Sequence, residues 1–206
     1  MNYLKNALIL LLLILSSFSS IAKGALSIEK GDVLINPSLT LGGYDYGYSW
    51  DIVNVIPPVA FNFEYASTNY LSFGLEAEYG LRRYKDNLFT ASDYLYKYEY
   101  KTIGFRGSFH YLDFFKNMLA DKLGGFNSEN LDFYVGASTG LLWINTTEKW
   151  DQEGMSVQHE RKTFDSNWRF GYFAGFRYYF SNRFGAFLET GKNPLGWVKV
   201  GLTLKL

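Results

Sequence analysis

Cysteine is absent from this chain of 206 residues, and proline is scarce, with four residues. Without cysteine the chain can form neither a disulfide framework nor the lipid attachment of a bacterial lipoprotein. The 20 basic and 20 acidic residues cancel to a net charge of zero, so bulk electrostatics predict no nucleic-acid partner. Beyond the N-terminus, no run of residues is apolar and long enough to predict a transmembrane helix.

The first residues have the pattern of a secretory signal peptide. Lys5 precedes an unbroken apolar run over 7–15, and Ser20 and Ala22 are small residues at the positions that a signal peptidase reads. The run is shorter than the about 20 residues that a spanning helix needs, which disfavours an uncleaved membrane anchor. We therefore expect a signal peptide over 1–22 and one mature domain over 23–206.

Aromatic residues and glycine are abundant, with 17 Tyr, 18 Phe, 5 Trp and 20 Gly. In a secreted chain without cysteine, this composition is typical of an all-β protein. The clearest strand is the last, where apolar and polar or small residues alternate from Val198 to Leu206. Side chains of a strand point to its two faces in turn, so one face is wholly apolar. A last strand that pairs with the first would close a barrel and remove the sheet edge.

Seven further segments alternate in the same way, and none has a charge on its apolar face. The predicted strands are 33–44, 59–65, 71–82, 102–110, 133–143, 168–178, 184–189 and the terminal 198–206. The connections 67–69 and 181–183 are tight turns, whereas 45–58, 85–96 and 145–167 are predicted as longer loops. Short turns at one end and longer loops at the other are typical of outer-membrane barrels.

Two connections depart from this alternation of loop lengths, the link 113–130 and the brief last loop 192–194. In 113–130, Phe115, Met118, Leu119 and Leu123 recur at helical spacing. We expect a short amphipathic helix in this periplasmic link, lying on the inner leaflet or packed as a turn without lipid contact.

The polar face of the strands indicates which side is interior. It is rich in glycine, which has no steric use on a solvated face but makes room in a narrow lumen. Its charges are of both signs and interleaved, so they can pair when buried. The predicted lumen charge network is Glu64, Glu76, Glu78, Arg82, Arg106, Arg169, Arg177, Glu189, Lys199 and Lys205. Tyrosines cluster toward the strand ends, as in the aromatic girdles of membrane barrels. The apolar face is therefore predicted to point outward; a soluble lipocalin-like carrier would point it inward.

The segments 103–111, 131–136 and 184–191 carry a resemblance to a known family. They resemble the generic β-barrel domain of small eight-stranded outer-membrane proteins of Gram-negative bacteria, which include OmpX-like and opacity-type proteins and the OmpA barrel. The resemblance implies an antiparallel up-and-down barrel in the outer membrane, in contact with lipid and lipopolysaccharide. It also implies an assembly signal read by the barrel-assembly machinery, which Lys199, Gly201, Leu204 and Leu206 match. Leu206 departs from the aromatic residue usual at the last position.

The sequence offers one candidate for catalysis. Ser108 and His110 lie on one face of their strand, and outer-membrane enzymes of this size class modify lipid A with a Ser and a His. Their order is the reverse of that in lipid A deacylases, and the polar face places them inside the lumen, so His110 is interpreted as an interior polar residue. His159 falls in the longest predicted loop. We expect no catalytic site, no cofactor and no metal site.

The prediction for function is a monomeric, non-enzymatic barrel with a structural or surface-interaction role and a lumen plugged by paired charges. The charged segment 148–162 is predicted as an exterior loop that is solvated or binds an extracellular ligand. Three alternatives remain open: a lipid A-modifying enzyme, a narrow ion-conducting pore, and a soluble carrier.

Overall fold

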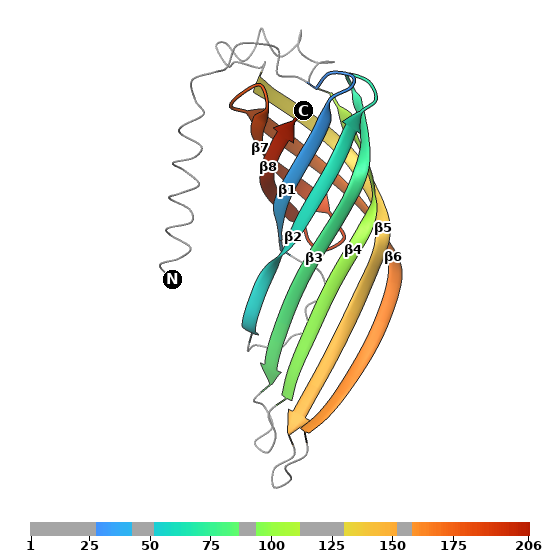
Figure 1. Ribbon diagram of the computed structural model, residues 1–206, viewed down its shortest axis with the longest axis vertical. Coiled ribbons are helices and arrows are strands. Elements are labelled where there is room, and N and C mark those ends of the chain that lie inside the picture. Colours follow the sequence, from blue (N-terminus) through green and yellow to red (C-terminus); the bar gives the residue numbers. More distant parts are fainter. Residues whose placement is uncertain (1–27, 43–51, 87–93, 112–129, 152–157) are drawn as a thin grey trace.

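The chain forms a closed barrel of eight antiparallel strands in sequence order, as predicted (Figure 1). The computed structural model describes residues 28–42, 52–86, 94–111, 130–151 and 158–206. The strands are β1 (Val33–Leu41), β2 (Ile52–Ala66), β3 (Leu71–Asp86), β4 (Tyr94–His110), β5 (Leu131–Asp151), β6 (Gln158–Tyr179), β7 (Phe184–Lys192) and β8 (Val198–Lys205). Within the described residues, no helix is long and apolar enough to cross a membrane.

Pairing of β1 with β8 closes the ring. Leu34 lies opposite Lys205, and Leu41 lies opposite Val198. The backbone of Val33 also exchanges hydrogen bonds with Leu206, whose amide donates to the carbonyl of Val33 at 2.9 Å. The last strand is therefore paired on both sides, so the ring itself leaves no open edge.

The apolar face of the barrel points outward and the polar face inward. Phe105 and Phe170 on the outer surface are 64% and 73% exposed, whereas Glu64 and Lys199 inside are fully buried. Glycines make room for the large side chains of the lumen. A Cβ at Gly175 would lie 2.6 Å from Cζ of Tyr134, and one at Gly136 would collide with the ring of Phe173. This arrangement is that of a protein whose outer solvent is lipid.

Two of the predicted long loops are largely strand. In place of the loop 145–167, β5 and β6 pair without a break up to Asp151 opposite Gln158. In place of the loop 45–58, β2 begins at Ile52, and its register shifts between Ile56 and Val59. The two prolines between them are accommodated in that irregularity. The predicted strand ends were wrong because they depended on the alternation of apolar and polar residues. Backbone hydrogen bonds between strands continue beyond the apolar region, where that alternation is lost.

The long strands β2 to β6 continue past the ring as one sheet (Figure 1). β1, β7 and β8 have 9, 9 and 8 residues, whereas β5 and β6 have 21 and 22. We call the continuation the projecting sheet; it comprises 52–58, 80–86, 94–101, 142–151 and 158–167. β7 pairs with β6 no further than Lys192 opposite Tyr172. Among the described residues, the edge of β6 over 158–171 therefore has no partner strand.

Several predictions lie outside the described residues. These are the signal peptide over 1–22, most of the predicted amphipathic helix over 113–130 and the aromatic residues of 44–50. The structure therefore leaves these as predictions.

Candidate functional site

The centre of the lumen is a network of ion pairs around Arg106 of β4. Its guanidinium lies 3.0 Å from Oε2 of Glu76, 2.6 Å from Oε1 of Glu189 and 3.4 Å from Oε1 of Glu64. On its other side the guanidinium carbon lies 4.2 Å from the centroid of the Phe173 ring. One cation thus links β2, β3 and β7 to its own strand.

A second centre is Lys199 of β8. Its ammonium lies 2.8 Å from Oε1 of Glu76 and pairs also with Glu78. Glu76 contacts both Arg106 and Lys199, so it joins the two centres. All three side chains are buried.

Arg177 of β6 forms the third centre, nearer the short turns. Nη1 lies 3.0 Å from Oδ2 of Asp132, and Nη2 lies 3.8 Å from Oε1 of Glu64. The guanidinium carbon lies 4.9 Å from the Tyr134 ring centroid, and the Tyr134 hydroxyl donates to Glu189 at 3.0 Å. Buried charges are stable only when they are paired and hydrogen-bonded in this way.

Seven of the ten residues predicted for the lumen meet in this network: Glu64, Glu76, Glu78, Arg106, Arg177, Glu189 and Lys199. The other three do not join it in the contacts described. Arg169 donates to Asn167 at 2.8 Å, and Lys205 lies 3.4 Å from Asp32 near the short turns. Arg82 is half-buried in the projecting sheet.

Asp132 and Tyr134 belong to the network but were missed from the sequence. Both alternate along β5 with outward-facing Phe133 and Val135. Asp132 falls just before the strand that the sequence predicted to begin at Phe133. A strand that begins two residues earlier, at Leu131, places Asp132 on the lumen face.

The candidate pair of Ser108 and His110 does not form, and both side chains are buried in the interior, as the polar face predicted. Ser108 donates to Glu64 at 3.0 Å, and Nε2 of His110 lies 3.0 Å from the hydroxyl of Ser72 on the neighbouring strand β3. Nδ1 of His110 lies 2.9 Å from Asp132. Ser72 is available to His110 because it lies directly across the ladder from Ser108, on the same inner face.

Ser72, His110 and Asp132 share the residue types of a hydrolytic triad but not its proton arrangement. The hydroxyl of Ser72 also donates to Oε2 of Glu64 at 2.9 Å. A hydroxyl has one proton, and nucleophilic activation requires that the imidazole receive it. All three side chains are buried. We therefore interpret the three residues as a hydrogen-bond chain that belongs to the lumen network.

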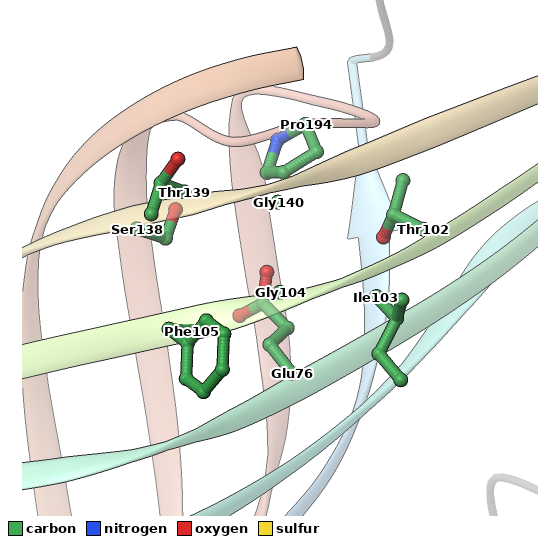
Figure 2. Close-up of a pocket in the computed structure, with 9 residues that line it drawn as sticks. All are labelled: Glu76, Thr102, Ile103, Gly104, Phe105, Ser138, Thr139, Gly140 and Pro194. Atoms are coloured by element: carbon green, nitrogen blue, oxygen red, sulfur yellow. The ribbon is translucent and has the colours of Figure 1, made fainter. Parts of the chain in front are cut away.

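The β7–β8 connection lies at the end of the ring from which the projecting sheet extends. Asn193, Pro194 and Leu195 are buried there. Beneath Pro194 lies a cavity of about 10 Å³, bordered by Glu76, Thr102 and Ser138 (Figure 2). Such a volume has room for about one water molecule, and the Ser138 hydroxyl has no hydrogen-bond partner in the protein. Side chains therefore fill most of the space at this place in the lumen.

The predicted assembly signal combines two environments. Lys199 is buried in the network, whereas the side chain of Leu206 is 62% exposed on the apolar face. Gly201 faces β1, where a Cβ would lie 2.6 Å from Cβ of Ser38. Leu204 lies opposite Phe184 of β7 and Ile35 of β1.

The base of the projecting sheet carries a polar cluster on its outward face. Asn145 and Tyr79 donate to the Glu99 carboxylate at 3.3 and 3.2 Å, and Lys101 lies 3.4 Å from it. Partial burial acts to raise the pKa of Glu99, but these hydrogen bonds and the Lys101 charge outweigh it and lower that pKa. On the opposite face, Tyr96, Tyr98 and Tyr100 stack with centroids 6.5 and 6.3 Å apart.

Among the side chains that the structure describes, no group of three His, Cys, Asp or Glu is placed to hold a metal ion.

No protein-family model matches the sequence, and no curated protein matches it. Among solved structures, the chain is similar to the attachment invasion locus protein Ail of Yersinia pestis, with 16% identity over 85% of this chain and 95% of that one and a TM-score of 0.43. It is similar to the outer membrane protein OprG from Pseudomonas aeruginosa, with 14% identity over 89% of this chain and 99% of OprG and a TM-score of 0.46. It is also similar to CarO2 of Acinetobacter baumannii, with 12% identity over 87% of this chain and 100% of CarO2 and a TM-score of 0.44.

Proposed function

We propose that this protein is an integral outer-membrane barrel with a sealed lumen, which presents the projecting sheet at the cell surface as an interaction module. The observation that carries the proposal is the inverted distribution of polarity. The outside is apolar and the inside holds paired charges, which suits lipid as the surrounding solvent.

The height of the apolar band supports this proposal. On β3 the outward residues are apolar from Leu71 to Leu81, and the next outward residue is Arg83. On β4 the last apolar outward residue of the band is Ile103, and the next outward residue is Lys101. Membrane-spanning strands have about 9–11 residues, and the hydrophobic band of such barrels is about 25 Å tall. The projecting sheet begins where the band ends, so it extends into the external medium when the short turns face the periplasm.

The free edge of β6 indicates how the projecting sheet would interact. Over 158–171 its outer N–H and C=O groups have no strand partner among the described residues. Such an edge accepts an extended peptide as an added strand. Two copies inserted the same way round would bring their β6 edges together in parallel, which is the weaker pairing. An extended segment of another protein, free to run antiparallel, suits the edge better.

The closed lumen argues against the alternative of an ion-conducting pore. Arg106 and Lys199 fill the central section with their acidic partners, and the buried residues of the β7–β8 connection lie at the end of the ring from which the projecting sheet extends. Eight-stranded barrels have interiors just wide enough for side chains. Reconstitution of the mature chain into planar bilayers is expected to give no stable conductance steps, and a regular open state would contradict the sealed lumen.

Fractionation tests the location independently. We expect the mature protein in the outer-membrane fraction, with faster migration of unboiled than of boiled samples in detergent gels. Recovery as a soluble periplasmic protein would exclude the membrane barrel and favour the carrier alternative.

The enzyme alternative has its own test. Lipid A from cells that express the Ser72→Ala or Ser108→Ala variant is expected to give the same mass spectrum as lipid A from cells with the unaltered protein. A lost or added acyl chain in either variant would restore the enzyme hypothesis.

A further inference from the structure

A groove of about 470 Å³ lies on the outward face of the projecting sheet. Its residues come from four neighbouring strands: Arg83 of β3, Leu95 and Lys97 of β4, Thr147 and Lys149 of β5, and Glu160 and Lys162 of β6. The ladder sets Arg83 opposite Lys97, Lys97 opposite Thr147, and Thr147 opposite Lys162. The sheet therefore aligns three cations in one row.

The groove has an excess of positive charge. It contains four cationic side chains and one carboxylate, Glu160, which pairs with Lys162 at 3.1 Å and with Lys149 at 3.8 Å. Among the described side chains, no ion pair is formed by Arg83 or Lys97. Like charges in one row repel each other, and among the side chains described around the groove only Glu160 offsets them. An anionic ligand would supply it.

The position of the groove selects the kind of anion. Arg83 is two residues beyond Leu81, the last apolar outward residue of β3, and Lys162 is six residues from Trp168 of the apolar band on β6. At about 3.4 Å per residue along strands tilted by about 40°, the groove covers roughly 5 to 20 Å above the band. This is the layer occupied by the sugars of the outer leaflet rather than by its acyl chains.

We infer that the groove binds the phosphorylated sugars of lipopolysaccharide in the outer leaflet around the barrel. Arg83 can hold a phosphate through two parallel N–H groups, whereas the three lysines act as point charges that tolerate variable sugar geometry. Leu95 and Thr147 add an apolar and an uncharged side chain to the lining, against which a sugar ring can pack. This inference rests on the proposed membrane location and adds a lipid partner to it.

The experiment compares two double variants of the mature barrel in detergent micelles. Arg83→Gln/Lys162→Gln removes two charges from the groove, whereas Arg82→Gln/Arg161→Gln removes two charges from the adjacent positions on the opposite face of the same strands. The probe is labelled lipopolysaccharide, followed by fluorescence anisotropy. We expect the groove variant to bind at least about tenfold more weakly, since each lost charge-assisted contact costs about that factor, and the opposite-face variant to bind within about twofold of the unaltered barrel.

Two further arms identify the ligand chemistry. Lipopolysaccharide stripped of its phosphates is expected to bind the unaltered barrel about tenfold more weakly. Inorganic phosphate alone should compete poorly, because it contacts only part of the row. Any of three results would overturn the inference. The two double variants could lose affinity equally, the stripped lipid could bind as tightly as the intact one, or inorganic phosphate could bind as tightly as lipopolysaccharide. Heat-modifiable migration of every variant tests membrane insertion separately, so failure of the groove is distinguishable from failure of the barrel.

Discussion

Lys199 of β8 and Glu76 of β3 meet inside the barrel, with Nζ and Oε1 2.8 Å apart, although their strands are not neighbours in the sheet. Backbone hydrogen bonds join each strand only to the next. This ion pair spans the lumen instead, and with Arg106 it ties separate parts of the wall together. The network therefore contributes a stabilising link that the sheet ladder cannot provide.

Removal of the charge at this position should destabilise the barrel strongly. In Lys199→Met, Glu76 and Glu78 lose their shared cation while they remain buried, and breaking a buried pair in this way costs about 3–5 kcal/mol. The free energy of unfolding in urea, measured in lipid vesicles, checks this value. Lys101→Met is the matched control: that ammonium is 48% exposed and lies 3.4 Å from Glu99, so we expect a loss of only about 0–1 kcal/mol. Similar losses in the two variants would contradict the central role of Lys199.

Outward-facing positions should be sensitive to charge only within the apolar band. Val200→Arg exposes a cation to lipid on β8 and is expected to cost about 2–4 kcal/mol if the position lies near the bilayer midplane. Ser166→Arg places the same side chain on the outward face of the projecting sheet, opposite Trp143 and outside the groove, where the cost should fall to about 0–1 kcal/mol. Refolding yield in vesicles reports both variants. Equal yields would show that the Val200 face does not contact lipid.

Gly175 should be required for the stability of the barrel because the Tyr134 ring occupies the space that a Cβ would need. A Cβ there would lie 2.6 Å from Cζ of Tyr134, which is buried and hydrogen-bonded to Glu189. Gly175→Ala is expected to cost about 1–3 kcal/mol through overpacking. In a double-mutant cycle with Tyr134→Leu, the alanine should cost less, because the ring that it meets is gone. An additive cycle would argue for a backbone effect of Gly175 instead.

The projecting sheet should be dispensable for the barrel itself. Deletion of 147–162, with Thr146 joined to Thr163 through an Asn-Gly turn, shortens β5 and β6 at a pair that is already in register. We expect the shortened chain to insert and to keep heat-modifiable migration, since the lumen network is untouched. A product that no longer inserts would show that the projecting strands take part in assembly.

The number and the faces of the strands were readable from the sequence. A strand has a period of two, and lipid outside with paired charges inside imposes opposite polarity on successive residues. The terminal segment from Val198 to Leu206 shows this most clearly. The strand ends were not readable, because the signal disappears where both faces meet water. Asn145 and Ser166 continue strands through backbone pairing although neither is apolar, with Asn145 opposite Phe164 and Ser166 opposite Trp143.

The identity of the partners was decided only by the tertiary structure. The sequence by itself determined that Glu76, Arg106 and Lys199 face the interior, because each alternates with apolar neighbours. Strand tilt and the stagger of the ring decide which carboxylate meets which cation. They also decide that His110 pairs with Ser72 rather than with Ser108. The same holds for the groove, since Arg83, Lys97 and Lys162 are far apart in the chain and become neighbours only through the register of β3 to β6. Alternation is a local property of the chain, whereas contacts across a lumen or along a row are set by closure of the whole sheet.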